Sequence, residues 1–163
     1  MSRYRPPASP KSPYITPEGM QILKHEQQDI WLRRRDVVAA LAAAAAEGDR
    51  SENAEYIYRK KELGGSDRRI RYLQKRLPEL QVVNRKPDNR ERVFFGATVT
   101  LEDEHGGQVT YRIVGSDEFD REAHYISVDS PLAKSLLKRE SGDEIEVEVP
   151  QGRLIYYISG IEY

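Results

Sequence analysis

Two stretches with heptad spacing, mirror-related about one turn, constrain the fold of this 163-residue chain more than any other feature. In each stretch, the positions expected to face the other stretch, here called the seam, recur at alternating steps of three and four residues, as in a coiled coil. If the stretches run antiparallel, the facing positions sum to the same number and the bend centres on Arg50. The facing pairs are Met20 with Leu80, Leu23 with Leu77, Gln27 with Leu73, Ile30 with Ile70, Val37 with Leu63, Leu41 with Arg59 and Ala44 with Tyr56. The sequence therefore predicts an antiparallel α-helical coiled-coil hairpin over residues 14–83, with its tip at 48–56.

The segments next to this hairpin differ in composition. Residues 1–13 combine four prolines with three basic residues, which predicts a mobile basic arm. Thr16 and Pro17 then form a typical helix start, with the threonine as N-cap. Within the second stretch, Gly64-Gly65-Ser66 predicts an interruption, read either as a local kink or as a flex point. Pro78 predicts the end of regular helix.

After a linker at residues 84–92, the spacing of apolar residues changes from one typical of helices to one typical of strands. A helix capped by Asp129 or Ser130, with Pro131 in its first turn, is expected over 132–139. Strands are expected at 93–101, 109–114, 125–128, 144–149 and 154–161. Residues 93–163 therefore predict a small antiparallel sheet with one short helix, which makes the whole chain α+β.

The overall net charge of -1 hides an asymmetry between the halves. Residues 1–85 carry 17 Lys and Arg against 11 Asp and Glu, whereas residues 86–163 carry 9 against 16. The two halves are thus expected to face different partners. The chain has no cysteine and no apolar run long enough to span a membrane, so a cytoplasmic location is expected. Its three histidines lack the spacing of metal ligands.

The acidic turn carries Asp49 and Glu52, three residues apart. One interpretation is a capping box, with Asp49 as the N-cap of the second helix and Glu52 as its third residue. The other is a pair of carboxylates for a hard cation, since Mg²⁺ is commonly held by one or two carboxylates, waters and a substrate phosphate. Two carboxylates alone make a poor site, so this interpretation requires another macromolecule's active centre to complete it.

A basic band is expected behind the tip, because the mirror relation brings Arg33–Arg35 level with Gly65–Asp67. Interspersed acids allow the alternative of a solvated coiled-coil flank with paired charges. The excess of positive charge favours contact with an RNA or DNA phosphate backbone. Because no aromatic stacking platform is evident among these residues, base-specific reading is not expected. The band on the second arm comprises Arg68, Arg69, Arg71, Lys75 and Arg76.

Seven segments of the chain form a recognisable set: Gly48-Asp49-Arg50-Ser51-Glu52-Asn53-Ala54-Glu55-Tyr56, Asp67–Leu73, Val93–Ala97, Arg112–Gly115, Tyr125–Ser127, Asp129–Ala133 and Ile161–Tyr163. In sequence and order they resemble the bacterial Gre transcript cleavage factors, and among them the GreB type. The resemblance covers nearly all of residues 14–163.

The resemblance implies an FKBP-like second domain and a coiled coil that enters the secondary channel of RNA polymerase. It implies that Asp49 and Glu52 help to hold a catalytic Mg²⁺ shared with the polymerase, which then hydrolyses the extruded 3′ end of a backtracked RNA. Ser51, Asn53 and Tyr56 would shape the tip, and the basic band would hold the RNA. The turn Asp129-Ser130-Pro131 would contact the rim of the channel. The chain would then be an activator of another active site, not an enzyme.

Two alternatives belong to other classes. A non-cleaving regulator would occupy the same channel, but it would not need both acids at the tip. A coiled-coil chaperone or scaffold would present an apolar tip to its clients, whereas this one is acidic.

Overall fold

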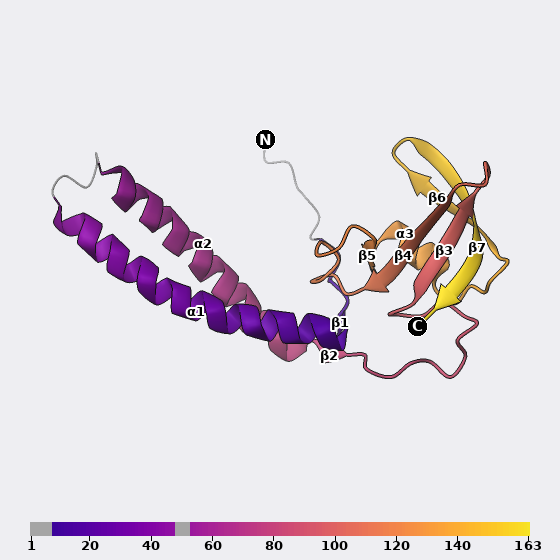
Figure 1. The fold of residues 1–163 in the computed structure, drawn as a ribbon, viewed down its shortest axis with the longest axis horizontal. Helices are drawn as coiled ribbons and strands as arrows, with labels where there is room; N and C mark the ends of the chain where they lie inside the picture. Colours follow the sequence, from indigo (N-terminus) through magenta and orange to yellow (C-terminus); the bar gives the residue numbers. More distant parts are fainter. Residues whose placement is uncertain (1–7, 48–52) are drawn as a thin grey trace. The chain divides into compact units, whose positions relative to one another are not determined.

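The computed structural model describes residues 8–47 and 53–163. The chain divides into two compact units. One is Met20–Leu80, and the other joins Met1–Gly19 to Gln81–Tyr163. The first is a helical hairpin and the second is built around a sheet (Figure 1). The unit boundaries differ from the predicted hairpin range of 14–83, because the first residues of that range and residues 81–83 join the sheet unit.

The hairpin consists of α1 (Pro17–Ala46) and α2 (Ala54–Arg76), followed by a single 3₁₀ turn, η1 (Leu77–Glu79). Thr16 caps α1 as predicted, since its Oγ1 accepts a hydrogen bond from the Gly19 backbone N–H at 3.0 Å. The 3₁₀ turn contains Pro78, so regular helix ends where the sequence predicted.

The predicted seam is confirmed, because every one of its positions in both helices is buried or half-buried. Leu23, Val37 and Ala44 are buried on α1, and Ser66, Ile70 and Leu73 are buried on α2. Ion pairs between the two helices support the antiparallel register. In each predicted facing pair the two residue numbers sum to 100. The observed pairs Arg33–Glu62, Arg34–Asp67 and Glu26–Arg69 sum to 95, 101 and 95.

The expected interruption at Gly64-Gly65 is not found, since α2 is one continuous helix from Ala54 to Arg76. A Cβ added at Gly64 would meet only a guanidinium nitrogen of Arg68, at 3.6 Å. At Gly65 the nearest such nitrogen is 3.8 Å away. The protein itself therefore does not require glycine at either position, and the helix continues because its backbone hydrogen bonds are unaffected.

The sheet unit contains a five-stranded sheet of order β5-β4-β3-β7-β6. It is antiparallel except for β4 and β5, which pair in parallel, so the sheet is mixed and not wholly antiparallel as predicted. The first strand begins later than predicted, at Thr98, because the chain forms only an isolated bridge at Arg92, to Glu140, and a turn within residues 93–97. The strands are β3 (Thr98–Asp103), β4 (Gln108–Val114), β5 (Tyr125–Ser127), β6 (Glu144–Val149) and β7 (Gly152–Glu162).

One helix, α3 (Pro131–Leu136), packs against this sheet and is shorter than the predicted 132–139. Ser130 is its N-cap and accepts a hydrogen bond from the Ala133 backbone N–H at 3.2 Å. The core between helix and sheet is apolar throughout. It comprises Val93, Ala97, Val99, Leu101, Ile113, Val128, Ala133, Leu136, Ile145, Val147 and Ile158.

A second, two-stranded sheet was not predicted. It pairs β1 (Tyr14–Ile15) in parallel with β2 (Gln81–Val82), each only two residues long. These strands lie immediately before α1 and after η1, so they hold the two ends of the hairpin's chain together within the sheet unit.

Glu118 fastens the first turn of α1 to the sheet unit. Its buried carboxylate accepts hydrogen bonds from the Thr16 N–H at 2.8 Å, the Thr16 hydroxyl at 2.5 Å and the Gly115 N–H at 2.9 Å. A Cβ at Gly19 would lie 2.2 Å from the same carboxylate. Glycine at position 19 is therefore required by close packing, unlike the pair at Gly64-Gly65.

Candidate functional site

Asn53 joins the two helices at the far end of the hairpin. Its Oδ1 accepts a hydrogen bond from the Tyr56 N–H at 3.1 Å, which makes Asn53 the N-cap of α2. Its Nδ2 donates to the Ala44 carbonyl of α1 at 2.7 Å. That carbonyl is one of the last four of α1, which lack partners within the helix. One side chain thus satisfies the ends of both helices, and Tyr56 is half-buried beside it.

The capping-box interpretation of the acidic turn is therefore wrong. The N-cap of α2 is Asn53, not Asp49, and Glu52 precedes the cap instead of following it. The rule that identified Asp49 fits Asn53 equally well, since both residue types cap helices. Asp49, Ser51 and Glu52 themselves lie outside the described residues. Among the residues that are described, no group of three or more His, Cys, Asp or Glu could hold a metal ion.

Glu62 ties the two arms together below this end. It accepts hydrogen bonds from Arg33 of the opposite arm at 2.8 Å and from Arg59 of its own helix at 3.0 Å. The bond from Arg33 is the main reason that the pKa of Glu62 lies below its usual value. Bonds to Glu55 and Glu62 in turn raise the pKa of Arg59. The charges of this region are consequently paired with one another.

The predicted basic band contains two arginines with structural partners. Arg69 donates to both carboxylate oxygens of Glu26 across the hairpin, at 2.6 and 3.0 Å, and its guanidinium lies over the Tyr72 ring. Arg76 is only 8% exposed and forms an ion pair with Glu79 at 3.6 Å. The side chain of Arg76 is thus mostly buried, and its assignment to an RNA-binding surface stays a prediction.

The other three members of the predicted band are exposed. Arg68, Arg71 and Lys75 form no ion pair within the part of the chain that the structure describes. Arg34 connects them to α1, because its Nε donates to Asp67 at 2.7 Å. The predicted approach of Arg33–Arg35 to this level of α2 is thus confirmed. Further exposed cations of the hairpin are Arg35, Lys60 and Lys61.

The turn before α3 is rigidly held. Both carboxylate oxygens of Asp129 accept hydrogen bonds from Ser12, one from its backbone N–H at 2.9 Å and the other from its hydroxyl. Ser130 caps the helix and Pro131 is exposed as its first residue. Ser12 and Pro13, which were predicted to belong to a mobile arm, instead form hydrogen bonds within the sheet unit. Residues 1–7 lie outside the described residues.

Sequence reasoning missed two features of these surfaces. The Ser12–Asp129 contact joins residues 117 positions apart, and no local pattern indicates it. The second is Trp31, an exposed aromatic residue of α1 beside Arg34. Its position three residues before Arg34 was a usable signal, because residues so spaced lie on the same face of a helix.

No helix in the described parts of the chain combines the length and apolar character needed to cross a membrane.

Two family profiles cover almost the whole chain. The description "Transcription elongation factor, N-terminal" matches residues 13–82, which comprise the helical hairpin with its flanking short strands. The description "Transcription elongation factor, GreA/GreB, C-term" matches residues 87–163, which comprise the five-stranded sheet and α3.

Curated relatives agree with these profiles over their full length. The chain is 54% identical to "Transcription elongation factor GreB" of Xanthomonas axonopodis pv. citri, covering 100% of this chain and 98% of the relative. It is 52% identical to the protein of the same name from Pseudomonas aeruginosa, with the same coverage. A solved structure titled "Prokaryotic transcription elongation factor GreA/GreB from Nitrosomonas europaea" is 20% identical, with a TM-score of 0.43 over 95% of this chain and all of that chain.

Proposed function

Because the chain belongs to the GreA/GreB family of transcription elongation factors, we propose that it rescues RNA polymerase halted by backtracking. In this proposal it stimulates the polymerase's own hydrolysis of the extruded 3′ end of the RNA. In this role the chain supplies groups to another protein's active site instead of acting as the enzyme itself.

The observation that best supports this role is the identity of the α2 cap. Asn53 is the N-cap of α2, the position that the capping-box interpretation gave to Asp49, with Glu52 as its partner. These two acids therefore have no required part in starting α2, although they lie in the segment that connects the two helices. Two acidic residues in a turn, without a capping role, favour a contribution to chemistry outside the chain.

The two tip carboxylates match the donors that Mg²⁺ uses when a phosphate and water complete its shell. Asp49 and Glu52 would hold the ion jointly with the polymerase. When bound, such an ion stabilises charge on a reacting phosphate and lowers the pKa of a bound water. Ser51 and Tyr56 would shape the tip, and Asn53 would fix its attachment to both helices.

Three cations of α2 are the proposed contacts for the extruded RNA. Arg68, Arg71 and Lys75 are exposed, and their charges are available to phosphate oxygens. Arg69 contributes by holding the two arms together through Glu26 instead of binding RNA directly. This division explains why only part of the predicted band is suited to binding.

In the proposed complex the hairpin enters the secondary channel and the sheet unit docks at its rim. The docking contact is assigned to the turn Asp129-Ser130-Pro131. Its backbone is preorganised by the Ser130 cap and by the bonds from Ser12 to Asp129, which lowers the conformational entropy lost on binding.

The experiment is a cleavage assay on stalled, backtracked elongation complexes with labelled RNA and Mg²⁺. We expect wild type to shorten the RNA and Asp49→Asn with Glu52→Gln to lose at least about a hundredfold in rate. Mutation of a residue that only supports a metal ligand already lowers metal affinity or activity by about 10- to 100-fold. The matched control is Glu47→Gln, which removes a neighbouring exposed acid at the end of α1.

Helix content of the double variant is expected to match wild type, because Asn53 still caps α2. Two results would contradict the proposal. If the double variant loses helix content together with cleavage, Asp49 and Glu52 have a structural role. Wild type that binds polymerase but leaves the RNA whole would favour a non-cleaving regulator of the same channel.

A further inference from the structure

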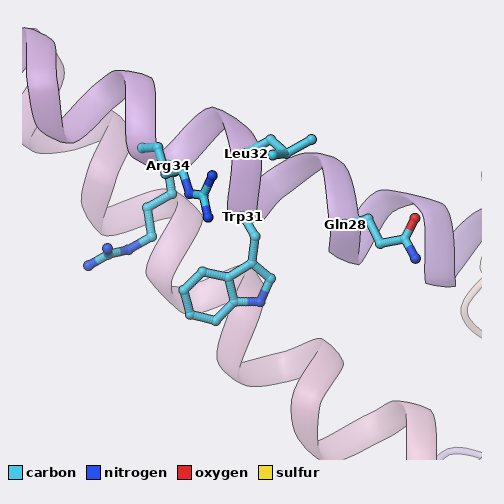
Figure 2. A pocket seen from close by; sticks show the side chains of 5 residues that line it. Gln28, Trp31, Leu32 and Arg34 are labelled. Carbon is cyan, nitrogen blue, oxygen red and sulfur yellow. The ribbon is translucent and has the colours of Figure 1, made fainter.

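An open hollow lined by residues of α1 surrounds the only tryptophan of the chain (Figure 2). Its volume is about 740 Å³, and Trp31 is 44% exposed within it. The indole lies between Arg34 and Gln28 along the helix. The lining residues are Gln28, Trp31, Leu32, Arg34 and Arg35.

Trp31 is not a seam residue, so its indole ring is not needed for packing between the two helices. The seam of α1 at this level uses Ile30 and Arg34. The indole is nevertheless held in place, because the Arg34 guanidinium lies 6.0 Å from the centre of its ring. Arg34 is in turn fixed by its 2.7 Å hydrogen bond to Asp67 of α2. A large aromatic face is thereby presented to solvent in a restricted orientation.

The same contact locates the hollow relative to the cations of α2. Arg34 faces Asp67, and Trp31 lies one turn earlier on the same side of α1. Since the helices are antiparallel and Trp31 lies three residues before Arg34, the position level with Trp31 on α2 lies three residues after Asp67, at Ile70, and the exposed Arg71 follows it. Exposed cations thus occur near this level on both helices, with Arg35 on α1 and Arg71 on α2.

An exposed aromatic face surrounded by cations is the combination that single-stranded nucleic acids recognise. The cations contact the phosphates, and the ring stacks on a base. A protein surface docked in this hollow would instead have to cover Arg34 and Arg35 along with the apolar groups. Between Asp67 and Arg76, α2 carries five cations and one acid, so charge complementarity favours a polyanion.

Resting on the function proposed above, we propose that Trp31 is a stacking platform for one base of the extruded single-stranded RNA, beside phosphates held by Arg35 and Arg71. Stacking does not depend on base identity, because every base has an aromatic face. The sequence-based expectation of no aromatic platform in the basic band is thus revised, while base-specific hydrogen bonding is still not expected.

The first test uses the full-length protein and the fluorescence of Trp31, its only indole. A short oligoadenylate should quench this fluorescence saturably. An abasic oligonucleotide with the same number of phosphates should bind roughly fivefold or more weakly, because stacking contributes about 1–3 kcal/mol per base. Equal affinity for the two probes, or no quenching by oligoadenylate, would overturn the proposal.

The second test is the cleavage assay with three variants. Trp31→Leu keeps an apolar side chain but removes the aromatic face, and should reduce cleavage at subsaturating factor roughly fivefold or more. Trp31→Phe should restore most of the loss. Ile22→Ala removes an exposed apolar residue of α1 outside the hollow and should behave as wild type.

The two proposals fail in distinguishable ways. If wild type cleaves and Trp31→Leu cleaves equally well, the stacking platform is wrong and the cleavage function stands. If wild type does not cleave, the cleavage function is wrong, and the two oligonucleotides still decide whether Trp31 stacks on bases. If Trp31→Leu loses affinity for polymerase that lacks extruded RNA, the hollow contacts protein and the proposal is wrong.

Discussion

In the sheet unit the core residues are all apolar, whereas the buried residues of the hairpin include Ser66 and Arg76. Half-buried Gln27, Arg34 and Arg59 occupy further seam positions. The sheet unit is therefore stabilised mainly by burial of apolar surface. The hairpin depends on a narrower apolar seam together with ion pairs between its arms.

Both units also expose large apolar side chains. The hairpin exposes Trp31, Leu32, Ile57 and Tyr58, each more than 40% accessible to solvent. The sheet unit likewise exposes Phe119, Leu154 and Tyr157, so exposure alone does not distinguish the two units. The comparison teaches that the unit with the weaker core presents the groups proposed to bind and react.

Substitution of a buried leucine should reveal the largest difference between the units. Leu101 lies in β3, the middle strand of the sheet, and is fully buried. We expect Leu101→Ala to lower the free energy of unfolding of the sheet unit by roughly 2–5 kcal/mol. Leu41→Ala in the half-buried seam should cost less than about 2 kcal/mol.

The two unfolding transitions can be followed separately in urea. Trp31 fluorescence reports on the hairpin, since the chain has no other tryptophan. Amide hydrogen exchange of the central strands reports on the sheet. Equal losses from the two leucine substitutions would show that the seam packs as tightly as the core.

Glycine substitutions should have an intermediate effect, with opposite signs in the two units. Gly64→Ala and Gly65→Ala should each stabilise the hairpin by about 1 kcal/mol, because a Cβ at either position meets only the Arg68 guanidinium. Gly19→Ala should destabilise the sheet unit, because its Cβ would lie 2.2 Å from the Glu118 carboxylate. Thermal unfolding followed by circular dichroism measures both effects. Destabilisation by Gly64→Ala would show that the hairpin needs glycine there.

The smallest expected effect is a pH dependence confined to the hairpin. The pKa of Glu62 lies below its ordinary value, chiefly because Arg33 donates a hydrogen bond to it. As the pH falls through the ordinary value for glutamate, the unfolded chain takes up a proton before the folded one does. Stability is therefore present above that range and is lost progressively below it.

Glu62→Gln should flatten this part of the pH profile, as measured by Trp31 fluorescence during urea unfolding at several pH values. Glu144→Gln, on the exposed face of β6, is the matched control and should leave the hairpin profile unchanged. A profile that keeps its slope in Glu62→Gln would assign the pH dependence to another acid.

The sequence predicted the hairpin and its register because helical periodicity is local and the mirror relation leaves one consistent pairing. It predicted the Ser130 cap for the same reason. The parallel pairing of β4 with β5 and the β1–β2 sheet depend on contacts between distant segments, which no local pattern specifies. Burial of Arg76 also escaped prediction, because composition shows that a residue is charged but not which way it faces.

The Asn53 amide has a consequence for how the end of the hairpin can change. Its bond to Ala44 closes a ring that contains the connecting segment, and its bond to Tyr56 caps α2. The ends of the two helices are therefore joined by a contact that the residues inside the ring do not supply. A different connecting segment, with a different chemical function, can therefore be joined to the same two helices.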